Sequence, residues 1–229
     1  ITEKGWQFSL DEGHRDPILD VDYVMAIYKQ TDPNYPGRAT IPVIVDVTTK
    51  KIVNNESQEI MQQLETNFMD FVKTDAPDLY PENLRTEIDA LNAILLAEIN
   101  QGVYKIKGAK TQADYEKYFH IFFNRLDQLE ARLADSRFLF GDQITDSDIR
   151  LYVSLARFDV AYYTTFRANR NRLTDFPNLW RYAKELYQMP AFQETTNFDA
   201  IKKGFASNNL EENPNQIVPL GPDTSIWDQ

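Results

Sequence analysis

The sequence offers few side chains for covalent or proton-transfer chemistry. It contains no cysteine, so residues 1–229 provide no thiolate nucleophile, no thiolate metal ligand and no disulfide. Its two histidines, His14 and His120, are too few for a histidine-rich metal site, and we predict no metal centre. The residue types of a serine–histidine–aspartate triad are present, but no G-x-S-x-G motif accompanies them.

The remaining candidates are phenols, one aromatic segment and one helix start, and each has a plain structural alternative. Tyr104 and Tyr187 are two of 12 tyrosines, most of which belong in a core or on a surface. Trp6 by itself is typical of a packed aromatic side chain, and Arg38 in a polar loop is typical of a solvated charge. The Glu56–Ser57 pair is explained equally well by helix capping.

Composition places these residues in a folded chain without a nucleic-acid or membrane surface. With 229 residues, 42% hydrophobic and 26% charged, the sequence can form one large domain or two small ones with a real core. The 24 basic and 35 acidic residues give 24 − 35 = −11, a charge that repels phosphate backbones. We find no basic cluster for an anionic membrane surface, no apolar run of roughly 18–20 residues and no basic-then-apolar leader.

The first 70 residues predict a small mixed α/β domain. Apolar spacing predicts a helix over residues 20–29, and a loop rich in proline and glycine follows. Two β-branched runs predict a hairpin with strands over residues 41–46 and 51–53. A helix then begins, with Asn55 as its N-cap and Glu56 in its first turn.

After a linker over residues 71–82, residues 83–229 predict an all-helical domain that ends in an extended tail from Asn208. A capping box of Thr145 and Asp148 opens the third helix. Pro177 occupies the first position of the fourth helix, and Pro190 is expected to end it. The predicted helices cover residues 84–99, 111–133, 145–162, 177–190 and, as a short element, 192–201.

The α/β part is too small to be a stable sheet by itself. About three strands are needed for independent stability, and only two are predicted. The strand IPVIVD is almost entirely apolar, as in strands that are covered on both faces. We therefore expect an upstream strand–helix–strand unit, or a partner that replaces it, and the start at Ile1 instead of methionine suggests a trimmed N-terminus.

The order of the parts resembles that of the glutathione transferases, in which a thioredoxin-like domain precedes an all-α domain. The segment Ile41–Pro42–Val43 resembles the strand that begins with a cis-proline. The segment Asn55–Glu56–Ser57 resembles the helix start that receives the γ-glutamyl carboxylate of glutathione. Free backbone N–H groups and a hydroxyl at a helix N-terminus suit that ligand.

One branch of this family, the Xi class or S-glutathionyl-hydroquinone reductases, is similar over essentially the whole chain. The resemblance implies an α/β plus all-α fold with an incomplete thioredoxin-like domain. The most specific segments are GVYK and ELYQMP, in this order and at this separation. The others are GRATIPVIVD, IVNNES, GDQITDSDIRLY, RFDVAYYTTF, FPNLWRYAKELYQMP and NPNQIVPLGP.

The resemblance implies a glutathione site in the first domain. Trp6 would lie against the glutathione, and Arg38 would be near its glycyl end. The backbone of Ile41 would hydrogen-bond the cysteinyl part, and Glu56 and Ser57 would hold the γ-glutamyl group.

The resemblance also implies an aromatic, quinone-type substrate under Tyr104 and Tyr187, whose phenols would hydrogen-bond a hydroquinone oxygen. Two segments depart from the family pattern. INQGVYKIKGAKTQ is more basic and less apolar after Tyr104, and KKGFASNNLEENPNQ lacks the tyrosines and histidine usual before the NP pair.

In this family a cysteine at a helix start attacks the glutathionyl sulfur, and a second glutathione resolves the mixed disulfide. A helix N-terminus lowers the pKa of such a thiol. The cysteine belongs to a Cys-Pro-Trp motif upstream of the Trp-x-Phe segment, which is where this sequence starts. The resemblance thus implies a glutathione-dependent reductase whose cysteine is not in this chain, and a homodimer. The acidic sequence without a leader suits the cytoplasm, or an organelle if a transit peptide was lost.

Two other hypotheses stay open. The chain could be a non-catalytic, transferase-like subunit that docks in a larger assembly, where a partner completes the sheet. An ordinary transferase that activates glutathione with a tyrosine or serine is weaker, because that residue also belongs to the first helix region.

Overall fold

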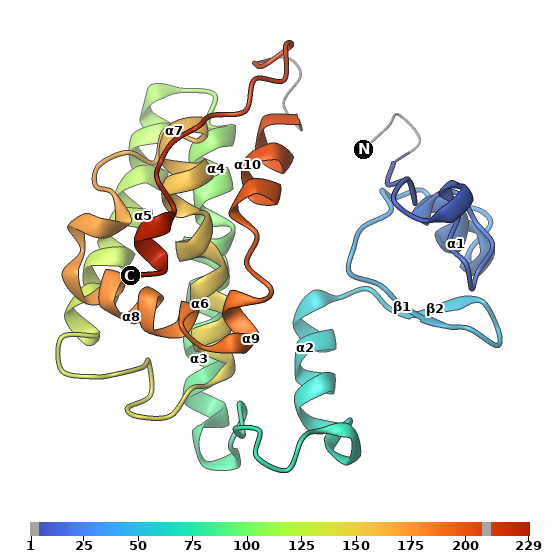
Figure 1. Cartoon of the computed structure of the whole chain (residues 1–229), viewed down its shortest axis with the longest axis horizontal. Helices are drawn as coiled ribbons and strands as arrows, with labels where there is room; N and C mark the ends of the chain where they lie inside the picture. The colour runs from blue at the N-terminus through green and yellow to red at the C-terminus, as the bar shows by residue number, and fades with distance from the viewer. Residues whose placement is uncertain (1–4, 208–211) are drawn as a thin grey trace. The chain divides into compact units, whose positions relative to one another are not determined.

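The computed structural model describes residues 5–207 and 212–229. The chain forms two compact units, unit 1 over Ile1–Ala76 and unit 2 over Pro77–Gln229. Figure 1 labels their helices and strands.

Unit 1 contains one hairpin and a few helices. The strands are β1 (Ile44–Asp46) and β2 (Lys51–Asn54), and the helices are α1 (Val24–Thr31) and α2 (Ser57–Thr66). Two short 3₁₀ turns, Glu12–His14 and Met69–Phe71, complete the unit. The helix predicted over residues 20–29 begins later than expected because Asp20 has a φ of 59°, which is incompatible with a right-handed helix.

The hairpin is antiparallel and begins after the proline. Val45 pairs with Ile52 and Asp46 pairs with Lys51. Pro42 has no N–H to donate to a ladder, so pairing starts at Ile44 and not at residue 41 as predicted. In the turn, the Asp46 carboxylate accepts the N–H groups of Thr48 and Thr49 at 2.8 and 3.0 Å, and these bonds lower the pKa of Asp46.

Small apolar clusters hold unit 1 together. One joins Leu19, Val21 and Ile27, and the other joins Val24, Tyr28 and Ala39 with the half-buried Trp6 against it. Strand β2 is tied to α1 by a hydrogen bond from the Ile52 N–H to the Thr31 hydroxyl at 2.9 Å. Several apolar side chains of this unit remain exposed, among them Val53, Leu64 and Phe71.

Unit 2 is helical. A 3₁₀ turn at Glu82–Leu84 precedes α3. The main helices are α3 (Arg85–Ile94), α4 (Gly102–Gly108), α5 (Gln112–Arg132), α6 (Asp146–Arg157), α7 (Tyr163–Thr165), α8 (Pro177–Tyr187), α9 (Pro190–Gln193) and α10 (Phe198–Ser207). Two π-helical segments, η4 (Leu95–Asn100) and η5 (Phe158–Tyr162), continue α3 and α6, and 3₁₀ turns lie at Leu173–Asp175 and Ser225–Trp227.

The region after Pro190 differs from its prediction. Helix α8 ends at Tyr187, and Pro190 begins α9 at its first position instead of ending α8. The single short helix expected over residues 192–201 is two helices, because the hydroxyls of Thr195 and Thr196 bond back to carbonyls of α9. The Asn197 side chain then accepts the N–H of Ala200 at 2.9 Å and starts α10. The extended tail predicted from Asn208 falls partly outside the described residues.

Phenylalanine side chains from different helices fill the core of unit 2. Phe122 and Phe123 of α5 contact Phe158 of η5 with ring centroids 5.9 and 6.3 Å apart. The other fully buried large side chains around them include Ile88, Leu95, Ile99, Ile106, Leu126, Leu133, Phe138, Phe166 and Tyr182. None of the described helices combines the length and the apolar character needed to cross a membrane.

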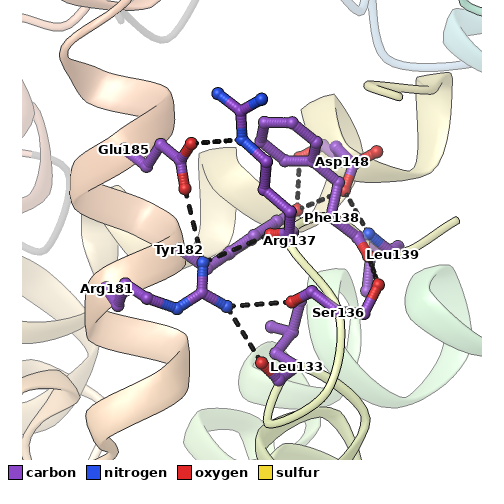
Figure 2. Close-up of polar contacts among 9 residues, drawn as sticks. All are labelled: Leu133, Ser136, Arg137, Phe138, Leu139, Asp148, Arg181, Tyr182 and Glu185. Atoms are coloured by element: carbon purple, nitrogen blue, oxygen red, sulfur yellow. Dashed lines mark hydrogen bonds and ion pairs between the residues drawn. The ribbon is translucent and has the colours of Figure 1, made fainter. Parts of the chain in front are cut away.

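The capping box at the start of α6 is confirmed and is buried in the core. Asp148 is fully buried, and its carboxylate accepts the N–H and the hydroxyl of Thr145 at 2.8 and 2.9 Å. It also accepts the Leu139 N–H and the Tyr182 hydroxyl, both at 2.9 Å. Figure 2 shows how this carboxylate connects the 133–139 loop to α8, where Glu185 binds Arg137.

Burial raises the pKa of the Asp148 carboxyl above 3.8, although its four donors oppose that shift. The folded chain therefore binds this proton more strongly than the unfolded chain does. The stability that protonation of Asp148 contributes is fully present below pH 3.8 and is lost as the pH rises through the folded-state pKa. We expect the stability deficit of Asp148→Asn relative to the native chain, measured by urea unfolding, to shrink from pH 3.5 to 7. A deficit that grows over this range would contradict the shift.

The C-terminal tail is anchored to unit 2 by an indole and a lysine. Trp227 is buried between Trp180 and Phe198, with ring centroids 4.9 and 5.3 Å away. The ammonium of Lys202, on α10, donates to the carbonyls of Leu220 and Pro222 at 2.8 and 3.1 Å. These contacts fix α10 and the tail to one another.

Candidate functional site

The Ile41–Pro42 peptide bond is cis, as the resemblance implies. Ile41 is 51% exposed and precedes the hairpin, so neither its N–H nor its carbonyl belongs to the ladder. Within the described residues, its backbone groups have no hydrogen-bond partner. They are available to a peptide-like ligand.

The first turn of α2 presents free donors. The Ile60 N–H makes the first bond inside the helix, to the Glu56 carbonyl at 2.9 Å, so the preceding N–H groups of the turn lack helical acceptors. The exposed hydroxyl of Ser57 lies at the same end. The helix N-terminus carries a partial positive charge, so this end is suited to a carboxylate.

The cap of α2 differs from the prediction. Glu56 and not Asn55 is the N-cap residue, and its side chain makes no capping bond. The Asn54 side chain instead accepts the Glu56 N–H at 2.8 Å and donates to Glu59 at 3.0 Å. Because Asn54, which precedes the helix, makes the hydrogen bonds of this turn, the hydroxyl and N–H of Ser57 remain available to a ligand.

Trp6 and Arg38 lie in the same unit as this turn. The half-buried indole of Trp6 packs against the cluster that contains Ala39, which follows Arg38 in the chain and precedes the cis bond by two residues. The Arg38 side chain is exposed, and its carbonyl accepts the Tyr35 hydroxyl at 3.3 Å. Within residues 5–207 and 212–229, no hydrogen bond or ion pair joins the Arg38 guanidinium to Glu56 or Ser57.

Tyr104 belongs to an aromatic cluster of unit 2, here called the Tyr104 cluster (Tyr104, Tyr162, Phe166 and Phe205). The Tyr104 ring meets Tyr162 and Phe166 edge-on at 6.1 and 5.1 Å, and Phe205 lies 5.6 Å from each of these two. Tyr104 is 50% exposed, whereas Tyr162 is buried. Burial and Tyr104 raise the pKa of the Tyr162 phenol, and Arg157 opposes the shift.

Tyr187 lies elsewhere in unit 2, under the C-terminal tail. It is 7% exposed, its ring contacts Phe198 and Trp227, and its hydroxyl donates to Asp228 at 3.1 Å. Burial, and then Asp228, raise the pKa of this phenol. Within the described chain, no ring contact joins Tyr187 to the Tyr104 cluster, so a role for it toward a substrate stays a prediction.

A groove of about 560 Å³ in unit 2 was not predicted. Ile149, Val153 and Arg157 of α6 form one side, and α9, α10 and the residues between them form the other. The four-residue spacing of Ile149, Val153 and Arg157 on α6 is the signal in the sequence that could have indicated this groove. Phe205 lines the groove and also belongs to the Tyr104 cluster.

Comparisons with known proteins bear on the family and the fold of the chain. Residues 112–185 match the family model of the glutathione S-transferase C-terminal domain. The glutathionyl-hydroquinone reductase YqjG of Escherichia coli is 38% identical over 97% of this chain and 68% of its own. The glutathionyl-hydroquinone reductase PcpF of Sphingobium chlorophenolicum is 40% identical over 97% of this chain and 71% of its own.

Solved structures give the same result. The glutathione-bound structure of YqjG superimposes with a TM-score of 0.91 at 37% identity, and covers 100% of this chain and 74% of that one. The Xi transferase of Phanerochaete chrysosporium has a TM-score of 0.86 at 41% identity, over 91% of this chain and 68% of that one. The chain has the glutathione transferase fold, and it belongs to the Xi-class glutathione transferases, the family of the glutathionyl-hydroquinone reductases.

Proposed function

We propose that the chain binds glutathione in unit 1 and takes part in the glutathione-dependent reduction of S-glutathionyl-hydroquinones. The supporting observation is the open first turn of α2, where Ser57 and free N–H groups can receive a carboxylate. The exposed backbone of Ile41 at the cis bond adds the donor and acceptor that a peptide-like ligand needs. Relatives with this fold are named as glutathionyl-hydroquinone reductases.

The reaction needs a thiolate, and residues 1–229 contain no cysteine. In our proposal a cysteine outside these residues attacks the glutathionyl sulfur and the carbon–sulfur bond breaks. The electron pair passes to the aromatic ring, which takes up a proton at that carbon and leaves as the hydroquinone. A second glutathione then attacks the mixed disulfide, so that oxidised glutathione leaves and the protein thiolate is restored.

In these reaction steps, the residues of this chain bind glutathione and orient the aromatic substrate. Glu56, Ser57, Arg38, Trp6 and the Ile41 backbone hold glutathione, and the Tyr104 phenol donates a hydrogen bond to a ring oxygen of the hydroquinone. The protein isolated from its source shows whether this cysteine exists, by thiol titration together with an intact-mass measurement. A reactive thiol is expected, and its absence would leave the reduction without a nucleophile.

The affinity for glutathione tests the site in unit 1. Ser57→Ala removes a hydroxyl bonded to a carboxylate, and bonds to charged groups are worth about 1.5–3 kcal/mol, so Kd should rise roughly tenfold or more. Isothermal titration calorimetry of the full chain with glutathione measures this Kd. Ser9→Ala, which makes the same change at an exposed position of unit 1, should leave Kd unaltered. Equal Kd values for Ser57→Ala and the native chain would remove Ser57 from the site.

A further inference from the structure

The groove beside the Tyr104 cluster has the lining of a site for a planar apolar ligand. Tyr152, Phe192 and Phe205 supply aromatic surface, and aliphatic side chains form much of the remaining lining. Its volume of about 560 Å³ is within the range of pockets for small molecules. All its lining residues belong to unit 2.

The hydroxyl groups of the groove are already bonded within the protein. The hydroxyls of Tyr152 and Thr196 share a hydrogen bond at 2.8 Å, and the Thr196 hydroxyl also donates to the Phe192 carbonyl at 2.7 Å. The Thr195 hydroxyl donates to the Ala191 carbonyl at 2.7 Å. A neutral polar ligand would have to displace these bonds.

Arg157 is the one charged residue among those that line the groove, and no carboxylate lines it in the described structure. Its guanidinium has five N–H donors. It donates one long bond, from Nη1 to the Val153 carbonyl at 3.3 Å, and it also interacts with the Tyr162 phenol through charge and a side-chain hydrogen bond. Within the described residues it has no carboxylate partner within ion-pair distance. Most of its donors therefore remain for an anion, and a carboxylate can accept two of them side by side.

The groove and the proposed catalytic phenol border the same aromatic cluster. Phe205 lines the groove and contacts Tyr162, and Tyr162 contacts Tyr104. A ring in the groove therefore lies beside the cluster that carries the exposed Tyr104 phenol.

We propose that this groove binds an aromatic carboxylate, with its ring against the aromatic wall of Tyr152, Phe192 and Phe205 and its carboxylate on Arg157. The identification of this ligand with the substrate rests on the proposed function. Under that function, the preferred substrates are S-glutathionyl-hydroquinones that carry a carboxylate. Shape and apolar contact alone would accept neutral rings equally well, so the arginine is the specificity-determining residue.

Binding is tested first, without any thiol. The full chain is titrated by calorimetry with 2-naphthoate and with 2-naphthamide, which has the same rings and no charge. Naphthoate should bind about tenfold more tightly, and Arg157→Gln should remove the difference. Arg172→Gln changes an exposed arginine of unit 2 outside the groove and should keep the difference in affinity between the two probes. Equal affinity of the native chain for the two probes, or an unchanged preference in Arg157→Gln, would overturn the proposal.

Turnover is tested second, on the thiol-bearing protein with a carboxylated S-glutathionyl-hydroquinone and its amide. A preference in kcat/KM of about tenfold for the acid, lost in Arg157→Gln, supports the proposal. Turnover of both without preference overturns it and leaves the proposed function intact. Preferential naphthoate binding without turnover of either substrate instead removes the proposed function and the substrate assignment. If the thiol-bearing protein does not bind naphthoate, another part of the protein covers the groove and the proposal fails.

Discussion

Replacement of Asp148 by alanine is expected to lower the free energy of unfolding by about 3–5 kcal/mol, the range in which loss of a buried network falls. The carboxylate is fully buried and accepts four hydrogen bonds, from the Thr145 N–H and hydroxyl, the Leu139 N–H and the Tyr182 hydroxyl. Alanine would leave these donors without partners and without access to water. Each buried unsatisfied group costs about 1–3 kcal/mol, and the loss of a helix cap adds to this.

Urea unfolding followed by circular dichroism measures this loss. The matched control is Asp142→Ala, which removes an exposed carboxylate from the loop before the same helix and should change the stability by less than about 0.5 kcal/mol. A loss below about 1 kcal/mol in Asp148→Ala would mean that water reaches the freed donors, which disagrees with their burial.

Tyr104→Phe is expected to lower kcat for S-glutathionyl-hydroquinones about a hundredfold. In enzymes generally, removal of one hydrogen-bond donor that faces developing negative charge lowers kcat by about this factor. The phenol is half exposed, and its ring is held edge-on by Tyr162 and Phe166. When the carbon–sulfur bond breaks, charge spreads onto the ring and its oxygens, where this phenol can donate. Phenylalanine keeps the ring contacts and removes only that donor.

Steady-state kinetics on the thiol-bearing protein decides this prediction. Tyr163→Phe makes the same change in a half-buried residue outside the Tyr104 cluster and should keep kcat within about twofold, since it removes no transition-state contact. Tyr187→Phe in the same assay tests the other tyrosine, whose phenol is bonded to Asp228. If kcat is unchanged in Tyr104→Phe, the phenol has no part in the chemistry.

Local patterns predicted the parts of the fold that are determined locally. The spacing of Thr145 and Asp148 is sufficient for a capping box, because both partners lie in one turn. Pro177 likewise marks the start of α8, since its fixed φ suits the first helical position. The start of α1 was missed because a left-handed Asp20 interrupts a pattern that apolar spacing alone reads as helical.

The candidate sites depend on contacts between distant segments, which spacing does not contain. Ile149, Val153 and Arg157 recur at the interval of a core stripe, but the structure leaves this face of α6 open as a groove. The burial of Tyr187 depends on Trp227, 40 positions further on, whose approach no local pattern indicates. The resemblance placed the cis bond at Pro42 correctly, because that feature is tied to a motif.

The anchored tail also has a spectroscopic consequence. Of the three tryptophans in the sequence, Trp180 and Trp227 lie edge to face at 4.9 Å in unit 2, and Trp6 is in unit 1. The docking of Trp227 thus brings two indole chromophores close enough for their transitions to couple, and the near-ultraviolet dichroism of that pair reports whether the tail is docked. In a chain in which both are phenylalanine, the tryptophan emission comes from Trp6 alone, in the unit that carries the cis-proline segment. Tryptophan therefore gives separate optical signals for the tail and for the unit of the proposed glutathione site.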